Sequence, residues 1–163
     1  MRQTWAFRRT QKLMRPGRIS LHGFLGSDKR VLADILEADE AEVRRHGITH
    51  QQIADRLVAL AEAGRDIAER EIVVENRYRV RVRDDRGVMP SPFGDGEFGK
   101  GDVALTDPTT NLQFRWNELT IHMIRHHGFY GGHGSLYRID PAEAIQAFEL
   151  HPDSGAETSG PAS

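Results

Sequence analysis

Histidine is concentrated in one stretch of the chain, from Asn117 to Asp140, with the sequence NELTIHMIRHHGFYGGHGSLYRID. This stretch holds half of the eight histidines and a cluster of glycines. Imidazole ligates metals, exchanges protons near neutral pH and hydrogen-bonds anions, so chemistry is expected here first. The four histidines are His122, His126, His127 and His133.

Two of these histidines have the spacing of a metal-binding pair. Asn117 is a typical N-cap, and we predict a helix from about Glu118 to His127. His122 and His126 are four residues apart, which places both imidazoles on one helical face. One candidate function is therefore a histidine-ligated metalloprotein, such as a hydrolase, holding zinc or another divalent metal. No HExxH motif supplies the further ligand; the candidates are His133, Asp95, Glu97 and His22.

The end of this helix and the loop FYGGHGSLYRI form a second candidate site. The helix dipole favours protonated imidazoles in the last turn, and the loop adds backbone N–H groups, a hydroxyl and a guanidinium that can hold a phosphate or carboxylate. The competing interpretation is a glycine turn whose aromatic residues pack the core. The leading prediction is a non-catalytic binding or accessory protein, without a cofactor, that recognises an anionic group or a protein partner. Its predicted ligand-binding residues are His126, His127, His133, Ser135 and Arg138.

A third candidate site is a row of arginines on a predicted strand. From Ile72 the hydrophobic period changes to two, and apolar residues at 78, 80 and 82 alternate with arginines. RNA is an alternative partner for this row, although the aromatic residues that would stack on bases alternate inward. The competing interpretation is cross-strand pairing with carboxylates such as Glu71, Glu75 or Asp102. The predicted basic strand face consists of Arg77, Arg79, Arg81 and Arg83.

Two helices are predicted before this strand. Ser27 or Asp28 can cap the first, and Gly47 can end it. Thr49 with Gln52 forms a capping box for the second. The phrase GITHQQIADRL resembles the start of a helix-turn-helix, but the helical pattern continues without the turn and recognition helix, so we do not expect DNA binding.

The remaining pattern completes an α+β fold. Apolar residues at 103–105 indicate another strand, and a turn at 107–111 leads into a third. The glycine-rich segment 87–102 is expected to be an ordered flap, with a mobile loop as the alternative. Asp140 followed by Pro141 begins a last helix. We predict an N-terminal helix pair, a three- or four-stranded antiparallel meander with its arginines outward, and two C-terminal helices.

Composition limits the classes of function. A net charge of -2 gives no general attraction to nucleic acid, and the absence of cysteine excludes disulfides, thiolate nucleophiles and cysteine-ligated metals. No apolar run is long enough to span a membrane and no signal peptide is evident, so we expect a cytoplasmic protein without a membrane partner. The 163 residues suit a single domain at 19–150. The basic segment 1–18 and the polar segment 151–163 are expected to be disordered tails, with Met14 as an alternative start.

Several phrases resemble small cytoplasmic bacterial proteins that have no assigned function. The phrases are GSDKR, THQQIADRL, PSPFGDG and HGFYGGHGSLYRIDP, and the resemblance covers about Leu21 to Leu150. It implies no activity, cofactor or catalytic residue. The candidate sites therefore depend on the chemistry of the residues themselves.

Overall fold

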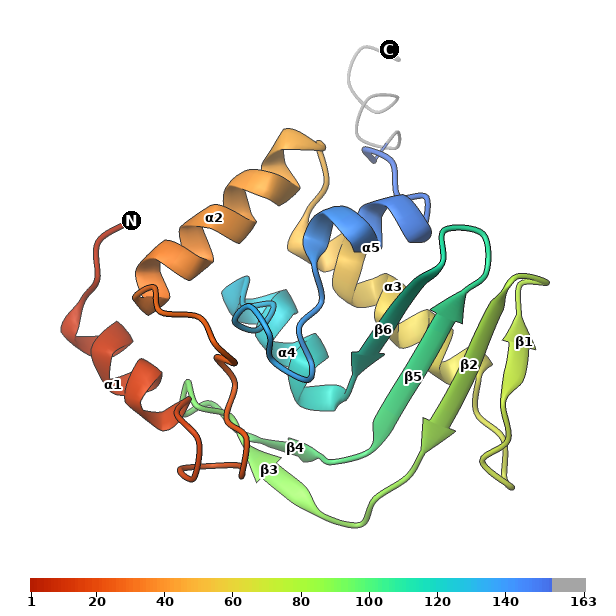
Figure 1. The fold of residues 1–163 in the computed structure, drawn as a ribbon, viewed down its shortest axis with the longest axis horizontal. Helices are drawn as coiled ribbons and strands as arrows, with labels where there is room; N and C mark the ends of the chain where they lie inside the picture. The colour runs from red at the N-terminus through yellow and green to blue at the C-terminus, as the bar shows by residue number, and fades with distance from the viewer. Residues whose placement is uncertain (154–163) are drawn as a thin grey trace, which may run out of the picture.

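Alternating apolar and charged residues build a four-stranded antiparallel sheet in the order β1-β2-β5-β6 (Figure 1). The computed structural model describes residues 1–153, which form five helices and six strands in two antiparallel sheets. The predicted α+β class is confirmed. The helices are α1 (Trp5–Leu13), α2 (Leu32–Arg45), α3 (His50–Ala63), α4 (Glu118–His127) and α5 (Pro141–Ala147). The strands are β1 (Ile72–Val74), β2 (Tyr78–Arg83), β3 (Val88–Pro90), β4 (Glu97–Gly99), β5 (Asp102–Asp107) and β6 (Leu112–Trp116).

One face of the four-stranded sheet is buried in a core shared with α3 and α5. Along β2, Tyr78, Val80 and Val82 are buried, while the arginines between them are exposed. The Tyr78 hydroxyl donates a hydrogen bond of 2.7 Å to the carbonyl oxygen of Ala147 in α5. The Phe148 ring packs edge-on against the Tyr78 ring, with the ring centres 5.9 Å apart. The predicted inward and outward faces of this strand are thus confirmed.

The predicted helix pair is present as α2 and α3, but its two N-termini differ in how they are capped. Thr49 and Gln52 form the predicted capping box at the start of α3. Helix α3 then continues unbroken to its end, which agrees with the absence of a helix-turn-helix. The cap predicted for α2 at Ser27 or Asp28 is wrong, because Val31 occupies the N-cap position and makes no side-chain hydrogen bond there.

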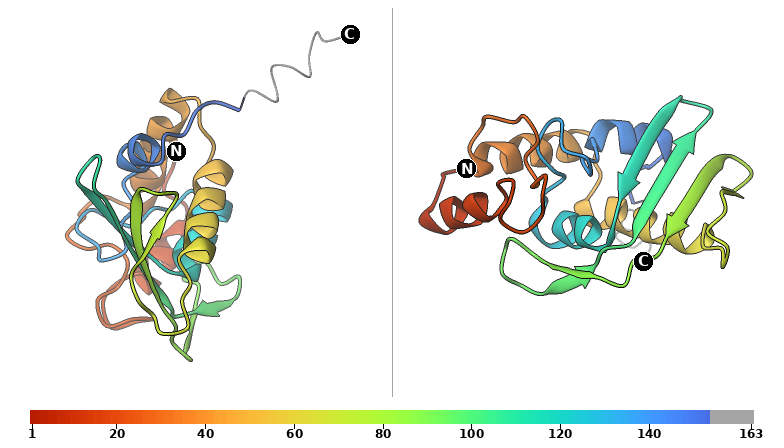
Figure 2. Two further views of the ribbon diagram at one scale, coloured as in Figure 1. Left: turned by 90° about the vertical axis from the view of Figure 1, so that its right-hand side faces the viewer. Right: turned by 60° about the horizontal axis from the view of Figure 1, so that its bottom comes forward.

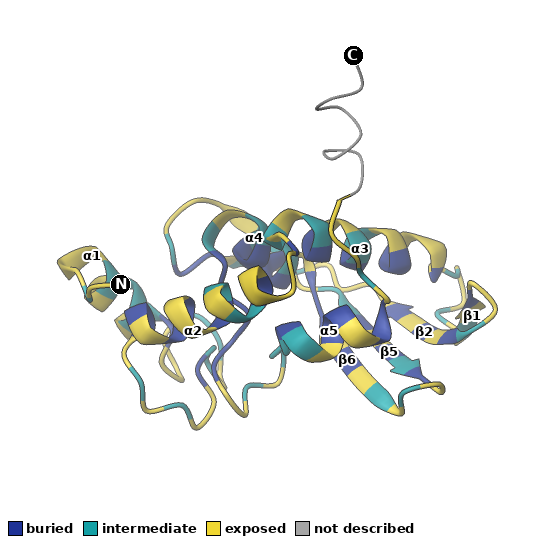
Figure 3. Cartoon of the chain, turned by 90° about the horizontal axis from the view of Figure 1, so that it is seen from above, coloured by how far each residue is buried: buried dark blue, intermediate teal, exposed yellow. Residues whose placement is uncertain are grey.

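Helix α4 is buried on two sides. Ile124 belongs to the core beneath the sheet, whereas Leu119 and Met123 belong to a second apolar cluster with residues of α2 and of the segment before it. Figure 3 shows α3 and α4 side by side, with buried residues along both helices. The helix begins at the predicted N-cap, Asn117, and ends at Gly128, whose φ of 63° is left-handed. Both ends of α4 are therefore fixed by local capping.

The N-terminal segment differs from the expected disordered tail over residues 1–18. Thr4 caps the helix α1, and Met14 at its end is completely buried in the second cluster. The Gln11 side chain accepts a hydrogen bond of 2.8 Å from the backbone N–H of Leu32, which satisfies an orphan donor at the start of α2. The basic residues of this segment are exposed, and Arg8, Arg9 and Lys12 among them lie on α1.

The arrangement also differs from a simple meander, because a second sheet interrupts it. Strands β3 and β4 pair as a hairpin within the segment predicted as a flap, and Figure 2 shows this hairpin folded back toward α4. The expectation that the flap is ordered is confirmed. The expected disordered tail at 151–163 falls mostly outside the described residues, which end at 153. Within the described part of the chain, every helix is too short or too polar to cross a bilayer.

Arg77, at the turn before β2, binds a buried carboxylate. It was predicted to belong to the exposed row of arginines on this strand. Its guanidinium donates two hydrogen bonds of 2.9 Å to Asp107, which is completely buried, and it also pairs with Glu149. Asp107 accepts further hydrogen bonds from Thr109 and Thr110 in the β5–β6 turn. This carboxylate therefore joins two turns at the same end of the sheet.

We predict that Asp107→Asn lowers the free energy of unfolding at neutral pH by about 2–3 kcal/mol, because Arg77 loses its buried charged partner. Urea unfolding measures the change. The control is Asp84→Asn, because Asp84 pairs with Arg65 but has a side chain 77% exposed. The control should change the free energy of unfolding by less than about 0.5 kcal/mol. Equal losses in the two variants would contradict the role assigned to Asp107.

The effect of Asp107→Asn should also depend on pH. The Arg77 guanidinium holds the pKa of the Asp107 carboxyl at about 2, against the opposing effect of burial. A carboxyl whose pKa is lowered by folding stabilises the protein above its unfolded pKa of about 4, and the stabilisation is lost as pH falls toward the folded value. The difference in unfolding free energy between the wild type and Asp107→Asn should therefore shrink as pH falls below about 4.

Candidate metal centre

The β3–β4 hairpin carries a carboxylate toward α4. The backbone N–H of Ser91 donates to the carbonyl oxygen of Gly96 at 2.8 Å, which closes the loop between the two strands. Asp95 lies in this loop, and the side chain of Glu118 at the start of α4 accepts a hydrogen bond of 2.9 Å from Gly99 in β4. The hairpin is thus tied to α4 near one end of the helix, and its loop lies over the helix face that carries the histidines.

Two phenylalanines of the hairpin stack on two histidines of α4. The Phe93 and His127 rings are parallel within 3°, with centres 3.8 Å apart. The Phe98 and His122 rings are inclined by 26°, with centres 4.2 Å apart. Each phenyl ring covers one face of an imidazole and restricts its rotation. The stacking fixes the direction in which the ring nitrogens point.

Both imidazoles point at the same carboxylate oxygen. Oδ2 of Asp95 lies 2.8 Å from Nε2 of His122 and 2.6 Å from Nε2 of His127. The side chains of the two histidines are 14% and 25% exposed, and that of Asp95 is 35% exposed. Among residues 1–153, these three form the one group of histidine and carboxylate residues whose potential ligand atoms all lie within 4.8 Å of one another. The site is a half-open cluster of two nitrogens and one carboxylate.

The Asp95 carboxyl is strongly favoured in its ionised form. Partial burial alone would raise its pKa, but hydrogen bonds from Ser91, His127 and His122 together outweigh burial and hold the pKa well below its usual range. Ser91 is itself buried, and its hydroxyl also accepts the backbone N–H of Phe93. Because an ionised carboxylate is acceptor-only, both imidazoles donate to it from Nε2. Once those two protons leave Nε2, the same three atoms are available to a metal ion.

The structure groups His122 with His127, whereas the helical spacing paired His122 with His126. The rings of His122 and His126 are 4.8 Å apart, but His126 is exposed and lies outside the cluster around Asp95. Asp95 was one of four candidates for the further ligand. Asp95 is the candidate that reaches the histidines, because the hairpin that carries it docks on α4. In the chain Asp95 is 27 residues from His122 and 32 residues from His127.

The five residues predicted to bind an anion have separate surroundings. His126 and His127 lie at the end of α4, but His133 lies near Asp28 and Arg30, with its Nε2 3.2 Å from the arginine. The guanidinium of Arg138 is bound by Asp39 at 2.7 and 3.0 Å and by the carbonyl oxygen of Gly131. The backbone N–H of Ser135 donates to the carbonyl oxygen of Gly132 within the glycine loop. Arg138 and the loop thus attach the C-terminal part of the chain to α2.

The basic strand face contains three arginines instead of the four predicted. Arg79, Arg81 and Arg83 are exposed on β2, and within the described residues none of them has an ion-pair partner at 4.0 Å or less. Arg77 is not part of this exposed row, because its guanidinium is bound to the buried carboxylate of Asp107. Asp102, one of the carboxylates expected to pair with the row, binds Arg115 on β6 instead. RNA binding by this face stays a prediction.

Sequence analysis missed a second histidine contact, at the start of α3. Nδ1 of His50 lies 2.7 Å from the hydroxyl of Tyr130, and its Nε2 lies 2.5 Å from a carboxylate oxygen of Glu40. The hydrogen bond from His50 lowers the pKa of the Glu40 carboxyl, whereas burial raises the pKa of the Tyr130 hydroxyl. Tyr130 is completely buried, and this chain of polar groups joins α2, α3 and the glycine loop.

Comparison with protein-family models, with curated proteins and with solved structures finds no match to this chain.

We predict that Phe93→Ala loosens the hairpin, because the stacking on His127 is worth about 1 kcal/mol. Amide hydrogen exchange at Ser91, whose N–H is bound within the hairpin, should accelerate about fivefold at that energy. The control is Val88→Ala on the same hairpin, because Val88 is 56% exposed. Equal acceleration in both variants would show that stacking on the imidazole does not hold the hairpin in place.

Proposed function

We propose that this protein binds a divalent metal ion through Asp95, His122 and His127 and uses the ion to act on a bound molecule. The observation that carries the proposal is the convergence of two imidazole nitrogens on one carboxylate oxygen, at 2.8 and 2.6 Å. Ligands of a tetrahedral zinc ion lie about 2.0–2.1 Å from the metal and therefore about 3.3 Å from one another. The carboxylate oxygen is therefore closer to each nitrogen than in a loaded site, and the three ligand atoms, all within 4.8 Å of one another, would move apart or together by small amounts to hold the ion.

The chemistry of the ligand set supports a transition metal over calcium or magnesium. Imidazole nitrogens suit zinc, iron, cobalt or nickel, whereas calcium and magnesium take oxygen ligands. The ionised Asp95 carboxylate carries no proton that the metal must displace. The Ser91 hydroxyl, which hydrogen-bonds to Asp95, acts as an outer partner that orients a ligand.

The number of ligands supports an ion that reacts rather than one that only holds the fold together. Structural zinc sites use four protein ligands, while catalytic sites use three and keep a position for water. A metal-bound water is acidified and can attack an ester, amide or phosphoryl group, so metal-assisted hydrolysis is the reaction class that this arrangement favours. The two phenyl rings over the imidazoles keep one side of the site apolar.

Titration of the untagged protein with Co²⁺ or Zn²⁺ tests the proposal. We expect one ion per chain, with an affinity that falls by more than about tenfold in Asp95→Asn, His122→Ala and His127→Ala. Affinity should also fall at acidic pH, since an imidazole must be deprotonated at the ligating nitrogen. Isothermal titration calorimetry gives the affinity, and visible absorption of Co²⁺ reports the geometry.

His126→Ala is the matched control, because it removes a neighbouring imidazole from the same helix without touching the three ligands. This variant should keep the affinity of the wild type. A loss in His126→Ala equal to that in His127→Ala would assign the site to the pair with helical spacing. The absence of stoichiometric binding in the wild type would overturn the proposal altogether.

A further inference from the structure

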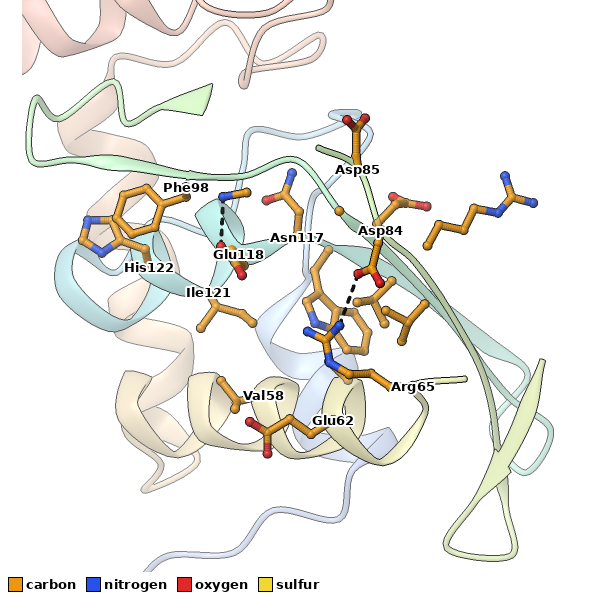
Figure 4. A pocket seen from close by; sticks show the side chains of 18 of the residues that line it. Val58, Glu62, Arg65, Asp84, Asp85, Phe98, Asn117, Glu118, Ile121 and His122 are labelled. Carbon is orange, nitrogen blue, oxygen red and sulfur yellow. Dashed lines mark hydrogen bonds and ion pairs between the residues drawn. The ribbon is translucent and has the colours of Figure 1, made fainter. Parts of the chain in front are cut away.

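A groove lies beside the candidate metal centre, between α3 and the strands that lead into α4. It has a volume of about 470 Å³, within the range of small-molecule sites. Figure 4 shows Phe98 and His122 at one end of the groove, and Arg65 with Asp84 at the other. The apolar part of its lining comes from Val58, Ala61, Val82, Val103 and Ile121. An apolar body of small size fits such a surface.

The groove is also where the described chain leaves hydrogen-bond donors without partners. Within residues 1–153, the buried side-chain nitrogen and oxygen atoms that lack any hydrogen-bond partner are Nε1 of Trp116 and Nε of Arg125. Both residues line the groove, and Trp116 is completely buried. A buried donor without an acceptor costs about 1–3 kcal/mol. Both atoms are N–H groups, so what each of them lacks is an acceptor.

The charged groups around the groove are already partly engaged with each other. Nη2 of Arg125 donates a hydrogen bond of 2.7 Å to the Asp55 carboxylate in α3, and Nη1 of Arg65 donates one of 3.2 Å to Asp84. The Glu118 carboxylate accepts the backbone N–H of Gly99. Among the buried groups of this lining, the two N–H donors are the ones without a partner, and they select an oxygen acceptor such as a carbonyl or carboxylate.

We propose that this groove binds a small organic molecule with an apolar body and a carbonyl or carboxylate oxygen, to which Trp116 Nε1 and Arg125 Nε donate hydrogen bonds. Binding in the groove does not require the metal. Because His122 and Phe98 line the groove and also belong to the candidate metal centre, the bound molecule lies next to the ion. This last step alone depends on the proposed metal function.

The indole N–H of Trp116 provides a direct test. The chain has two tryptophans, and Trp5 is 72% exposed, so Trp5→Phe leaves a single indole signal in a ¹H–¹⁵N spectrum. Metal-free Trp5→Phe protein is titrated with benzoate, benzamide and benzylammonium, which share a ring and differ in their acceptors. We expect benzoate or benzamide to move the indole proton downfield with saturation, and benzylammonium to leave it in place. An indole signal unmoved by about 10 mM benzoate and benzamide would overturn the proposal.

Two substitutions locate the binding, both made in the Trp5→Phe protein. Val58→Phe fills the groove from α3 and should weaken binding of the responding probe at least tenfold, whereas Val73→Phe adds the same ring on the exposed sheet edge and should leave binding unchanged. Equal weakening by both would overturn the assignment to this groove.

A third variant separates this proposal from the metal proposal. His127→Ala removes a metal ligand that does not line the groove, and it should keep the affinity for the responding probe. Mn²⁺ added to the protein with His127 intact should broaden the proton signals of the bound probe, and His127→Ala should abolish the broadening. Retained probe binding without broadening by Mn²⁺ would overturn the placement beside the ion, while the groove proposal stands.

Discussion

The burial of α4 in two separate apolar clusters is the constraint on which the rest of the structure depends. Ile124 packs into the core beneath the sheet, and Leu119 and Met123 pack into the cluster with α2. A helix held in this way cannot rotate without exposing one apolar face or the other. The direction of its histidines is therefore fixed by these apolar residues. His122 and His127 lie on the part of the helix surface that neither cluster covers.

The β3–β4 hairpin is what covers that surface. Its phenylalanines lie flat on the imidazoles, and its aspartate occupies the space between their nitrogens. A hairpin of two three-residue strands is marginal by itself, so its position depends on these contacts and on the link between Gly99 and Glu118. The candidate metal centre and the docking of the hairpin are the same set of interactions. Binding a metal there would stabilise the hairpin by mass action.

Features that depend on neighbours in sequence were predictable. The capping box at Thr49, the N-cap at Asn117 and the Asp140-Pro141 helix start are all present, because each is a contact within one turn of helix. The alternation along β2 also placed its apolar side chains correctly. These signals are local, and the groups that satisfy them lie a few residues apart.

Features that depend on distant partners were not predictable from one sequence. Helical spacing favours His126 as the partner of His122, but a carboxylate brought in from another element contacts His122 and His127. Arg77 resembled its neighbours in the strand until folding placed Asp107 beside it. The basic segment around α1 was expected to be disordered, and the burial of Met14 that holds it arises from contacts with α2 and the following loop.

A crystal structure of the protein grown with Zn²⁺, with anomalous scattering to locate the ion, shows whether Asp95, His122 and His127 bind one metal together. We predict one strong anomalous peak, about 2.0–2.2 Å from Nε2 of His122, Nε2 of His127 and a carboxylate oxygen of Asp95. An ion bound through His126, or no ion on this face of α4, would contradict this prediction.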